Sequence, residues 1–262
     1  MIAPRELPAE FYAWNRRHRA PFGRRNRLSR FLGDRYRGPF AFQANNGTRV
    51  YEYPWAYSAI NAHRVSRGRP LTIVELGGSL AGLQWVLARE GHRVINVDPG
   101  LEARGVGWDV NAGRHHALSR AFGAPVELIP KNLAAAGLAD GVADVLLSVS
   151  TIEHFAPADL AEFAAHAARI IKPDGVVVLT IDLFLDLSPF SAVEHHQYGT
   201  NVDIRRLLAD AKLELVQGNP KELHGYPEFT PERVMAGLAG YLVGQPYPAL
   251  AQCLIARKDA MM

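Results

Sequence analysis

The chain has 262 residues, of which 48% are hydrophobic and 21% charged, as is typical of a globular protein with a large core. It contains no run of 18 apolar residues, no apolar signal core near its start and one cysteine, Cys253. A membrane span, a disulfide framework and a cysteine-based metal cluster are therefore not expected, and we expect a cytoplasmic protein.

The net charge of +3 is unevenly distributed. Residues 1–40 contain ten Arg and three acidic residues, whereas the remainder contains 19 Lys and Arg against 23 acidic residues. We treat residues 1–47 as a basic, aromatic arm with a short helix over 8–19, and residues 48–262 as the main domain. The arm could be a cap whose aromatic residues pack on the domain, a surface for RNA or an anionic substrate, or a disordered tail. Its aromatic residues favour the cap.

The stretch before the first buried strand is rich in aromatic residues. Residues 50–53 suggest a short strand, and Pro54 is expected in the first turn of a helix over 54–67 that ends at Gly68. The aromatic side chains here are expected to pack in the core, although some could line a substrate or methionine pocket. They are Tyr51, Tyr53, Trp55 and Tyr57.

Residues 71–100 predict a strand, a glycine turn, a helix and a second strand. The apolar run 71–76 is interrupted by Gly77-Gly78-Ser79, a helical pattern from residue 80 ends at Gly91, and the strand 93–97 ends at Asp98. A turn without bulky Cβ atoms lets a ligand approach the backbone and the first amides of the helix. A carboxylate at the next strand tip can accept hydrogen bonds from two ribose hydroxyls. These features predict a nucleoside-bearing cofactor.

The same residues resemble motif I of the class I S-adenosylmethionine (SAM)-dependent methyltransferases, in which spaced glycines follow an acidic residue. Here Glu75 precedes Gly77 and Gly78, although Ser79 and Ala81 stand where the family often has glycine. The resemblance implies that Asp98 holds the ribose hydroxyls.

Two later blocks strengthen this resemblance. A helix over 111–122 and a strand over 125–129 precede DVLLSVSTIEHF, which begins in a predicted strand over 143–149, and RIIKPDGVVVLT, which ends in one over 176–181. The two blocks resemble motifs IV to VI of the same family, and a helix opened by Pro157 joins them. The resemblance covers roughly residues 70–217.

The resemblance implies an α/β fold, a Rossmann-like, doubly wound, mostly parallel sheet of seven strands whose last, reversed strand lies at an edge. A helix capped by Asn201, a strand over 213–217, an insertion over 219–248 with a helix from Thr230, and a final strand over 250–256 complete the expected order.

The resemblance also implies SAM as the cofactor and S-adenosylhomocysteine as the product. The expected cofactor-binding residues are Glu75, Gly77, Gly78, Ser79, Asp98, Pro99, Asn132, Leu133, Ser148 and Ser150. A base is needed only if the methyl acceptor loses a proton, and candidates must follow the fourth and fifth strands or lie on lids. The candidate catalytic residues are His154, Glu153, Asp182 and His195, and we favour His154 as the base.

Candidate substrate contacts are Tyr12, His196, Tyr198 and His224. We expect no metal, because Ser150 stands where a metal-binding variant of motif IV has a carboxylate.

We favour a methyltransferase for a small, possibly anionic molecule, enclosed by the arm, residues 183–199 and residues 219–248. Three alternatives remain. One is an RNA or protein methyltransferase that docks through the arm. Another is an enzyme that cyclises SAM and releases methylthioadenosine, and the last is a non-catalytic SAM-binding protein. The oligomeric state stays open.

Overall fold

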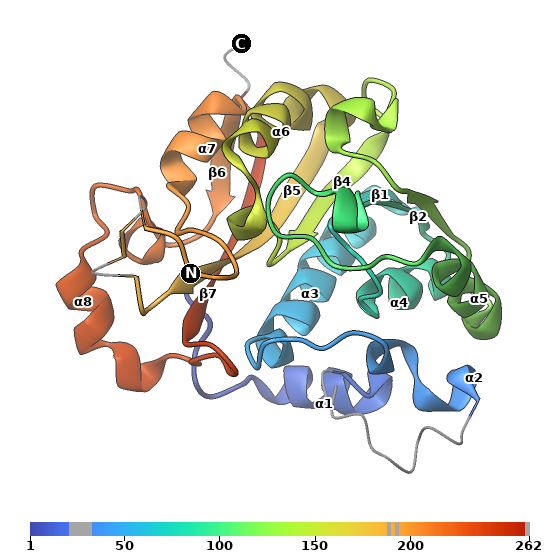
Figure 1. Ribbon diagram of the computed structural model, residues 1–262, viewed down its shortest axis with the longest axis horizontal. Coiled ribbons are helices and arrows are strands. Elements are labelled where there is room, and N and C mark those ends of the chain that lie inside the picture. The colour runs from blue at the N-terminus through green and yellow to red at the C-terminus, as the bar shows by residue number, and fades with distance from the viewer. Residues whose placement is uncertain (21–32, 188–189, 192–193, 260–262) are drawn as a thin grey trace.

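The computed structural model describes residues 1–20, 33–187, 190–191 and 194–259. Its centre is one seven-stranded sheet in the order β3-β2-β1-β4-β5-β7-β6 (Figure 1). The strands are β1 (Thr72–Leu76), β2 (Arg93–Val97), β3 (Val126–Ile129), β4 (Ala143–Val149), β5 (Ile171–Phe184), β6 (Leu213–Gln217) and β7 (Ala249–Lys258). The four pairs formed among β1 to β5 are parallel, and β7 is antiparallel to both β5 and β6.

The predicted Rossmann-like sheet with a reversed last strand is confirmed, but the expectation that this strand lies at an edge is wrong. β7 lies between β5 and β6, and residues 249–254 are almost completely buried. A strand that is apolar on both faces gains most from covered faces and two paired edges. β6 forms the edge instead, and its Val216 is 53% exposed.

Helices cover both faces of the sheet (Figure 1). They are α1 (Ala9–His18), α2 (Asp34–Arg37), α3 (Arg49–Arg67), α4 (Leu83–Arg89), α5 (Ala112–Phe122), α6 (Pro157–Ile170), α7 (Ile204–Asp210) and α8 (Pro231–Ala236). Because alternate residues of a strand point to opposite faces, Ile73 packs with Ile60 of α3 and Trp85 of α4, whereas Val74 packs with Phe163 of α6. The sheet therefore separates two hydrophobic cores.

The strand predicted over residues 50–53 is wrong, because these residues belong to α3. Tyrosine and valine favour strands, but Tyr51 and Tyr53 are buried against neighbouring elements, and such packing overrides local preference. Pro54 then lies inside the helix and cannot donate to the carbonyl of Val50. The side-chain amide of Asn15 in α1 donates to that carbonyl instead, at 2.7 Å.

The described part of the arm packs on α3 and on itself through aromatic rings. The Phe11 ring lies 5.1 Å from the Tyr51 ring, and the Trp14 ring lies 5.7 Å from Phe40 and 5.4 Å from Tyr57. The predicted cluster of Arg24, Arg25, Arg27 and Arg30 falls outside the described residues.

Two element starts differ from the predictions. The N-cap of α7 is Asp203, whose side chain accepts from the Arg206 amide at 2.8 Å, whereas Asn201 forms two hydrogen bonds with the Phe184 backbone. β5 begins at Ile171, and residues 172–175 form an irregularity in its pairing with β4. Within the described ranges, no helix is long and apolar enough to cross a membrane.

Candidate functional site

Two cavities meet at the carboxyl ends of β1, β2 and β4. The first lies beside the residues that follow β2 and β3, and the second lies beside the start of α3 and residues 246–247. Four residues line both cavities: Gly77, Trp108, Thr151 and His154. A long ligand could therefore pass from one cavity into the other across Gly77.

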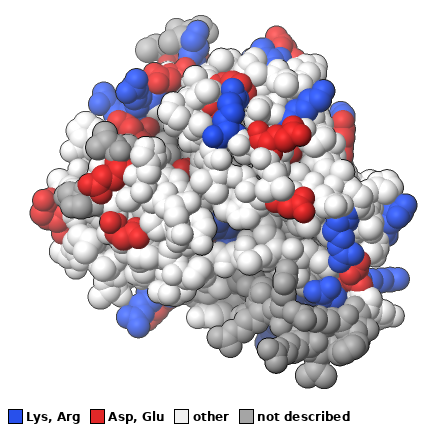
Figure 2. Space-filling view, viewed as in Figure 1, with Lys and Arg blue, Asp and Glu red and all other residues white. Residues whose placement is uncertain are grey.

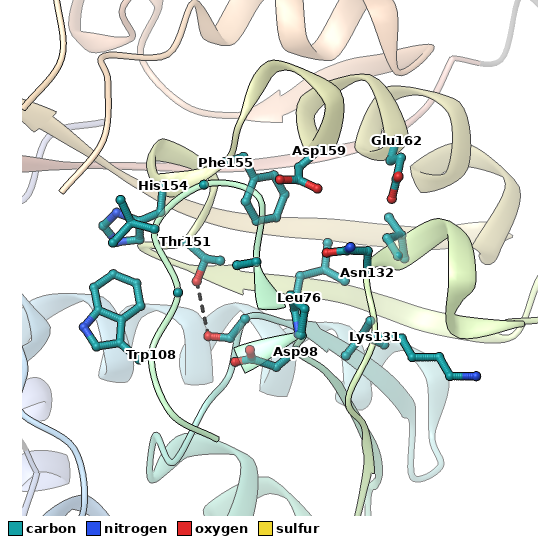
Figure 3. A pocket seen from close by; sticks show the side chains of 18 residues that line it. Leu76, Asp98, Trp108, Lys131, Asn132, Thr151, His154, Phe155, Asp159 and Glu162 are labelled. Atoms are coloured by element: carbon teal, nitrogen blue, oxygen red, sulfur yellow. Dashed lines mark hydrogen bonds between the residues drawn. The ribbon is translucent and has the colours of Figure 1, made fainter. Parts of the chain in front are cut away.

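Asp98 is the central polar group of the first cavity (Figure 3). Its two carboxylate oxygens accept hydrogen bonds from the amides of Ser79 and Gly100, both at 2.7 Å. Burial raises the pKa of Asp98, and these two amides oppose the rise. A carboxylate offers about four acceptor positions. Two positions thus remain for hydroxyl donors of a ligand such as ribose.

The walls of the first cavity combine apolar, polar and charged side chains. Asn132 and Leu133 follow β3, and Phe155 precedes α6. Arg104 donates to Asp159 at 2.7 Å and also contacts Glu162, which ties the loop after β2 to α6. Figure 3 shows Phe155, Asn132 and Leu76 around the space above Asp98. A flat apolar ring with a polar edge would fit between these walls.

The turn after β1 depends on Gly77. Its φ of +66° favours glycine, and a Cβ atom there would lie 2.1 Å from Cγ2 of Thr151. The helix expected from residue 80 begins only at Leu83, and the contact of its first amides with a ligand stays a prediction. In the turn before it, the amides of Gly78 and Ser79 donate to Asn96 and Asp98.

Glu75 lines the second cavity and is incompletely hydrogen-bonded. Its side chain is 2% exposed, and the buried Oε2 atom has no hydrogen-bond partner. Burial, followed by the charge of Asp98, raises the pKa of Glu75 to about 8. An unpaired buried carboxyl is costly, so a cationic donor in this cavity would be stabilising.

His154 separates the two cavities. Its Nδ1 atom contacts the carbonyl oxygen of Tyr198, which can only accept, so Nδ1 carries the proton and Nε2 is an acceptor. Burial lowers the pKa of His154 to about 4, so the imidazole is neutral near pH 7. The Trp108 ring packs against the imidazole at 4.6 Å.

The structure brings most of the predicted site residues together. Those that line at least one cavity are Glu75, Gly77, Gly78, Asp98, Pro99, Asn132, Leu133, Ser150, His154 and Tyr198. Others lie behind the walls: Ser79 donates to Asp98, and the Asp182 carboxylate is 3.0 Å from the hydroxyl oxygens of both Ser150 and Tyr247.

The remaining predicted residues do not line either cavity. Ser148 and Glu153 are fully buried, and His196 stacks on Phe184 with 4.7 Å between the rings. Tyr12 is 60% exposed on α1, His195 is exposed, and Nδ1 of His224 lies 3.1 Å from the Val202 carbonyl oxygen. Their roles stay predictions. Throughout the described ranges, no group of three or more His, Cys, Asp or Glu is placed to hold a metal ion.

Sequence reasoning missed several residues of the second cavity. They are Gln43, Asn45, Asn46, Arg49, Pro246 and Tyr247. Only one signal could have found part of this set: Arg49 and Glu52 have the spacing of an ion pair on a helix. Glu52, however, lay within the strand predicted over residues 50–53, and Arg49 directly preceded it. Tyr247 comes from a distant segment, and nothing in its local sequence marks it.

Comparison with known proteins supports the chemistry that this geometry favours. Residues 74–179 match a family model described as a methyltransferase domain. No curated protein sequence matches the chain.

Solved structures share the fold at low identity. Magnesium protoporphyrin IX methyltransferase from Synechocystis PCC 6803, with bound SAM, is 16% identical over 92% of this chain and 99% of that one, with a TM-score of 0.51. The 1,6-didemethyltoxoflavin-N1-methyltransferase of Burkholderia thailandensis is 19% identical over 98% and 95%, also with 0.51. Geranyl diphosphate C-methyltransferase of Streptomyces coelicolor A3(2) is 12% identical over 79% and 78%, with 0.51.

The reversed strand within the sheet, the glycine turn after Glu75, the position of Asp98 and the matched domain all agree. Residues 74–179 therefore form a methyltransferase domain, and the chain shares the fold of SAM-dependent methyltransferases of known structure.

Proposed function

We propose that this protein methylates a small molecule bound in the second cavity, with the nucleoside of SAM in the first. The observation that carries this proposal is the junction of the two cavities at Gly77 and His154. A donor that spans the junction would present its reactive centre to an acceptor on the far side. Bound SAM supplies a methyl group already activated on a sulfonium, so the protein mainly has to align the reactants.

The residues present fit this cofactor at both of its ends. Asp98 retains acceptor positions for the ribose hydroxyls, and Asn132 and Leu133 would contact the adenine. Glu75 has an unpaired buried oxygen beside the second cavity, which suits the ammonium group of the amino-acid end. Ionic pairing would favour the charged form of Glu75 and lower its pKa.

The second cavity suits a small acceptor with aromatic and polar character. Its walls include the rings of Tyr53, Tyr198 and Tyr247, together with Asn45 and Asn46. Arg49 also lines the cavity, but its guanidinium already pairs with Glu52. The described walls thus give an anionic acceptor little support, and that expectation rests on the basic arm alone.

The described residues on the face shown in Figure 2 give no special support to a macromolecular acceptor. Figure 2 shows positive and negative side chains interspersed on the face that it presents. The magnesium protoporphyrin IX and toxoflavin-type neighbours are enzymes whose names specify small molecules. We therefore place RNA and protein acceptors second.

The test combines binding with product identification. Calorimetry should detect binding of both SAM and S-adenosylhomocysteine. Incubation of the protein with a small-molecule extract and SAM labelled in its methyl group should give a labelled small product and S-adenosylhomocysteine, both identified by mass spectrometry.

Label recovered in RNA or protein would show that the acceptor is a macromolecule and would overturn the small-molecule proposal. Release of methylthioadenosine would indicate cyclisation of SAM, and bound but unchanged SAM would indicate a binding protein.

A further inference from the structure

A buried cluster of two carboxylates lies directly behind the second cavity. Glu52 of α3 and Asp182 of β5 are both fully buried, and the Ser150 hydroxyl lies between them. Oγ of Ser150 is 2.8 Å from Oε1 of Glu52 and 3.0 Å from Oδ1 of Asp182. The Thr180 hydroxyl lies 2.6 Å from the same Glu52 oxygen.

The cluster has fewer protons for hydrogen bonds than it has close contacts between oxygen atoms. A serine hydroxyl carries one proton, so Ser150 can donate to Glu52 or to Asp182 but not to both. Thr180 and Arg49 both donate hydrogen bonds to Glu52. Nη1 of Arg49 is 3.8 Å from Oδ1 of Asp182, which is too far for a hydrogen bond. With both carboxylates ionised, the contact between Asp182 and Ser150 therefore lacks a proton or takes it from Glu52.

Tyr247 connects this cluster to the second cavity. Its hydroxyl lies 3.0 Å from Oδ2 of Asp182, and its side chain lines the cavity. The titratable and charged groups that act on Asp182 are Arg49 and Glu52 from α3, Glu153 from the turn after β4, Tyr247, and Cys253 from β7. Among the described residues, Asp182 therefore contacts two hydroxyl groups, those of Ser150 and Tyr247, and both residues line the cavity.

We propose that Tyr247 passes the proton of the methyl acceptor to Asp182, and that the acceptor is accordingly a hydroxyl or an amine. This inference rests on the proposed methyl transfer. The acceptor atom forms a bond to the methyl carbon, the bond from that carbon to sulfur breaks, and its electron pair stays on sulfur. The acceptor's proton goes to the Tyr247 oxygen while the Tyr247 proton goes to Asp182, which becomes neutral.

The electrostatics of the cluster are consistent with this role. Burial raises the pKa of Asp182 to about 6, although Arg49 opposes the rise. The pKa of Glu52 lies below its ordinary value, because Arg49 and the hydroxyl groups of Thr180, Ser150 and Thr48 outweigh its burial. Protonation of Asp182 also removes one of two neighbouring negative charges. A base works best when its pKa is near the working pH, so Asp182 is better placed than His154, with its pKa of about 4.

A titration of the free protein tests the cluster without any acceptor. Aspartate carboxyl carbons labelled with ¹³C are followed by NMR against pH, and the loss of one signal in Asp182→Asn assigns residue 182. We expect a midpoint near 6. Tyr247→Phe should raise that midpoint by about one to two units, because it removes a hydrogen bond to the charged form.

Tyr198→Phe is the matched control for the titration. The Tyr198 ring lies 4.6 Å from the Tyr247 ring and lines the same cavity, but Asp182 accepts its tyrosine hydrogen bond from Tyr247. The Asp182 midpoint should stay unchanged in this variant. A midpoint in the ordinary range of aspartate, or an equal shift in both variants, would overturn the proposal.

The labelled product from the extract tests the catalytic step. The new methyl group should be on oxygen or nitrogen, and Tyr247→Phe should lower kcat by about 100-fold, leave SAM affinity unchanged and remove the loss of activity below about pH 6. A methylated sulfide, or full activity in Tyr247→Phe, would refute the relay. SAM binding without any product would instead count against the proposed methyl transfer, and the titration would still decide whether the cluster takes up a proton.

Discussion

The two cavities at the carboxyl edge of the sheet are built from different kinds of sequence information. The first takes Asp98 and Asn132 from residues that directly follow β2 and β3, so strand order alone places them together. Behind the second, Ser150 contacts Glu52 98 positions earlier, and Tyr247 contacts Asp182 65 positions earlier. A local motif can therefore reveal the first cavity, whereas the second cavity depends on the complete fold.

The polar groups of the two regions are also held differently. Asp98 is held by two backbone amides, which carry no net charge. The cluster behind the second cavity is held by side chains of opposite charge, with Arg49 against Glu52 and Asp182. Loss of one partner should therefore cost more in the second region than in the first, because the remaining charges stay buried.

Arg49→Met should show the largest effect. It leaves Glu52 and Asp182 buried without their cation, so we expect a loss of about 3–5 kcal/mol in the free energy of unfolding, measured with urea at neutral pH. Arg206→Met is the control, since Arg206 forms an exposed pair with Asp210 and its loss should cost about 0–1 kcal/mol. Similar losses in both variants would show that the cluster is not held by charge.

Glu75→Gln tests the residue of the second cavity whose buried oxygen has no hydrogen-bond partner. Because the folded-state pKa of Glu75 is raised from 4.5 to about 8, the folded protein binds a proton that the unfolded chain has lost over this range. The stability contributed by neutral Glu75 is therefore full below pH 4.5 and is lost as the pH rises to about 8.

Glutamine does not ionise, so Glu75→Gln should gain about 2–4 kcal/mol relative to the wild type between about pH 5 and pH 8, in urea unfolding at each pH. A constant difference across this range would contradict the raised pKa. With SAM bound, the wild-type stability should depend less on pH, because an ammonium partner lowers the pKa of Glu75.

Asp98→Ala should weaken SAM binding by about 1–3 kcal/mol, the scale of a lost buried polar contact. Calorimetry measures this affinity, and urea unfolding of the same variant measures the separate cost of leaving the Ser79 and Gly100 amides without an acceptor. Asp210→Ala, on the exposed side of α7, should bind SAM normally. If Asp98→Ala bound SAM with wild-type affinity, the assignment of Asp98 to the ribose hydroxyls would be refuted.

Gly77→Ala should show the smallest loss of stability among these variants, controls aside. Gly137 is its matched control, because its φ is +67° and nothing lies within 4 Å of an added Cβ. Both variants have the same backbone strain, but only Gly77→Ala meets Thr151. We expect Gly77→Ala to cost about 1–2 kcal/mol more in thermal or urea unfolding. Equal losses of stability in the two variants would mean that β1 and β4 can move apart freely near Gly77.

The sequence determined the parts of the protein that depend on short-range pattern. Buried strands at regular spacing, the turn after Glu75 and the carboxylate Asp98 after the next strand predicted a nucleoside-bearing cofactor, and the family resemblance that these residues carry implied the sheet and SAM. These features are local, because a parallel strand and its following loop carry the chemistry within a few residues.

Only the tertiary structure decided the rest. It placed residues 50–53 in a helix, since burial of Tyr51 and Tyr53 outweighs their preference for strands, and it placed β7 inside the sheet, where both of its apolar faces are covered. It also gathered Arg49, Asp182 and Tyr247 around one buried cluster. A polar cluster of this kind is stable only when all its partners arrive from distant segments, and local sequence carries no record of that pairing.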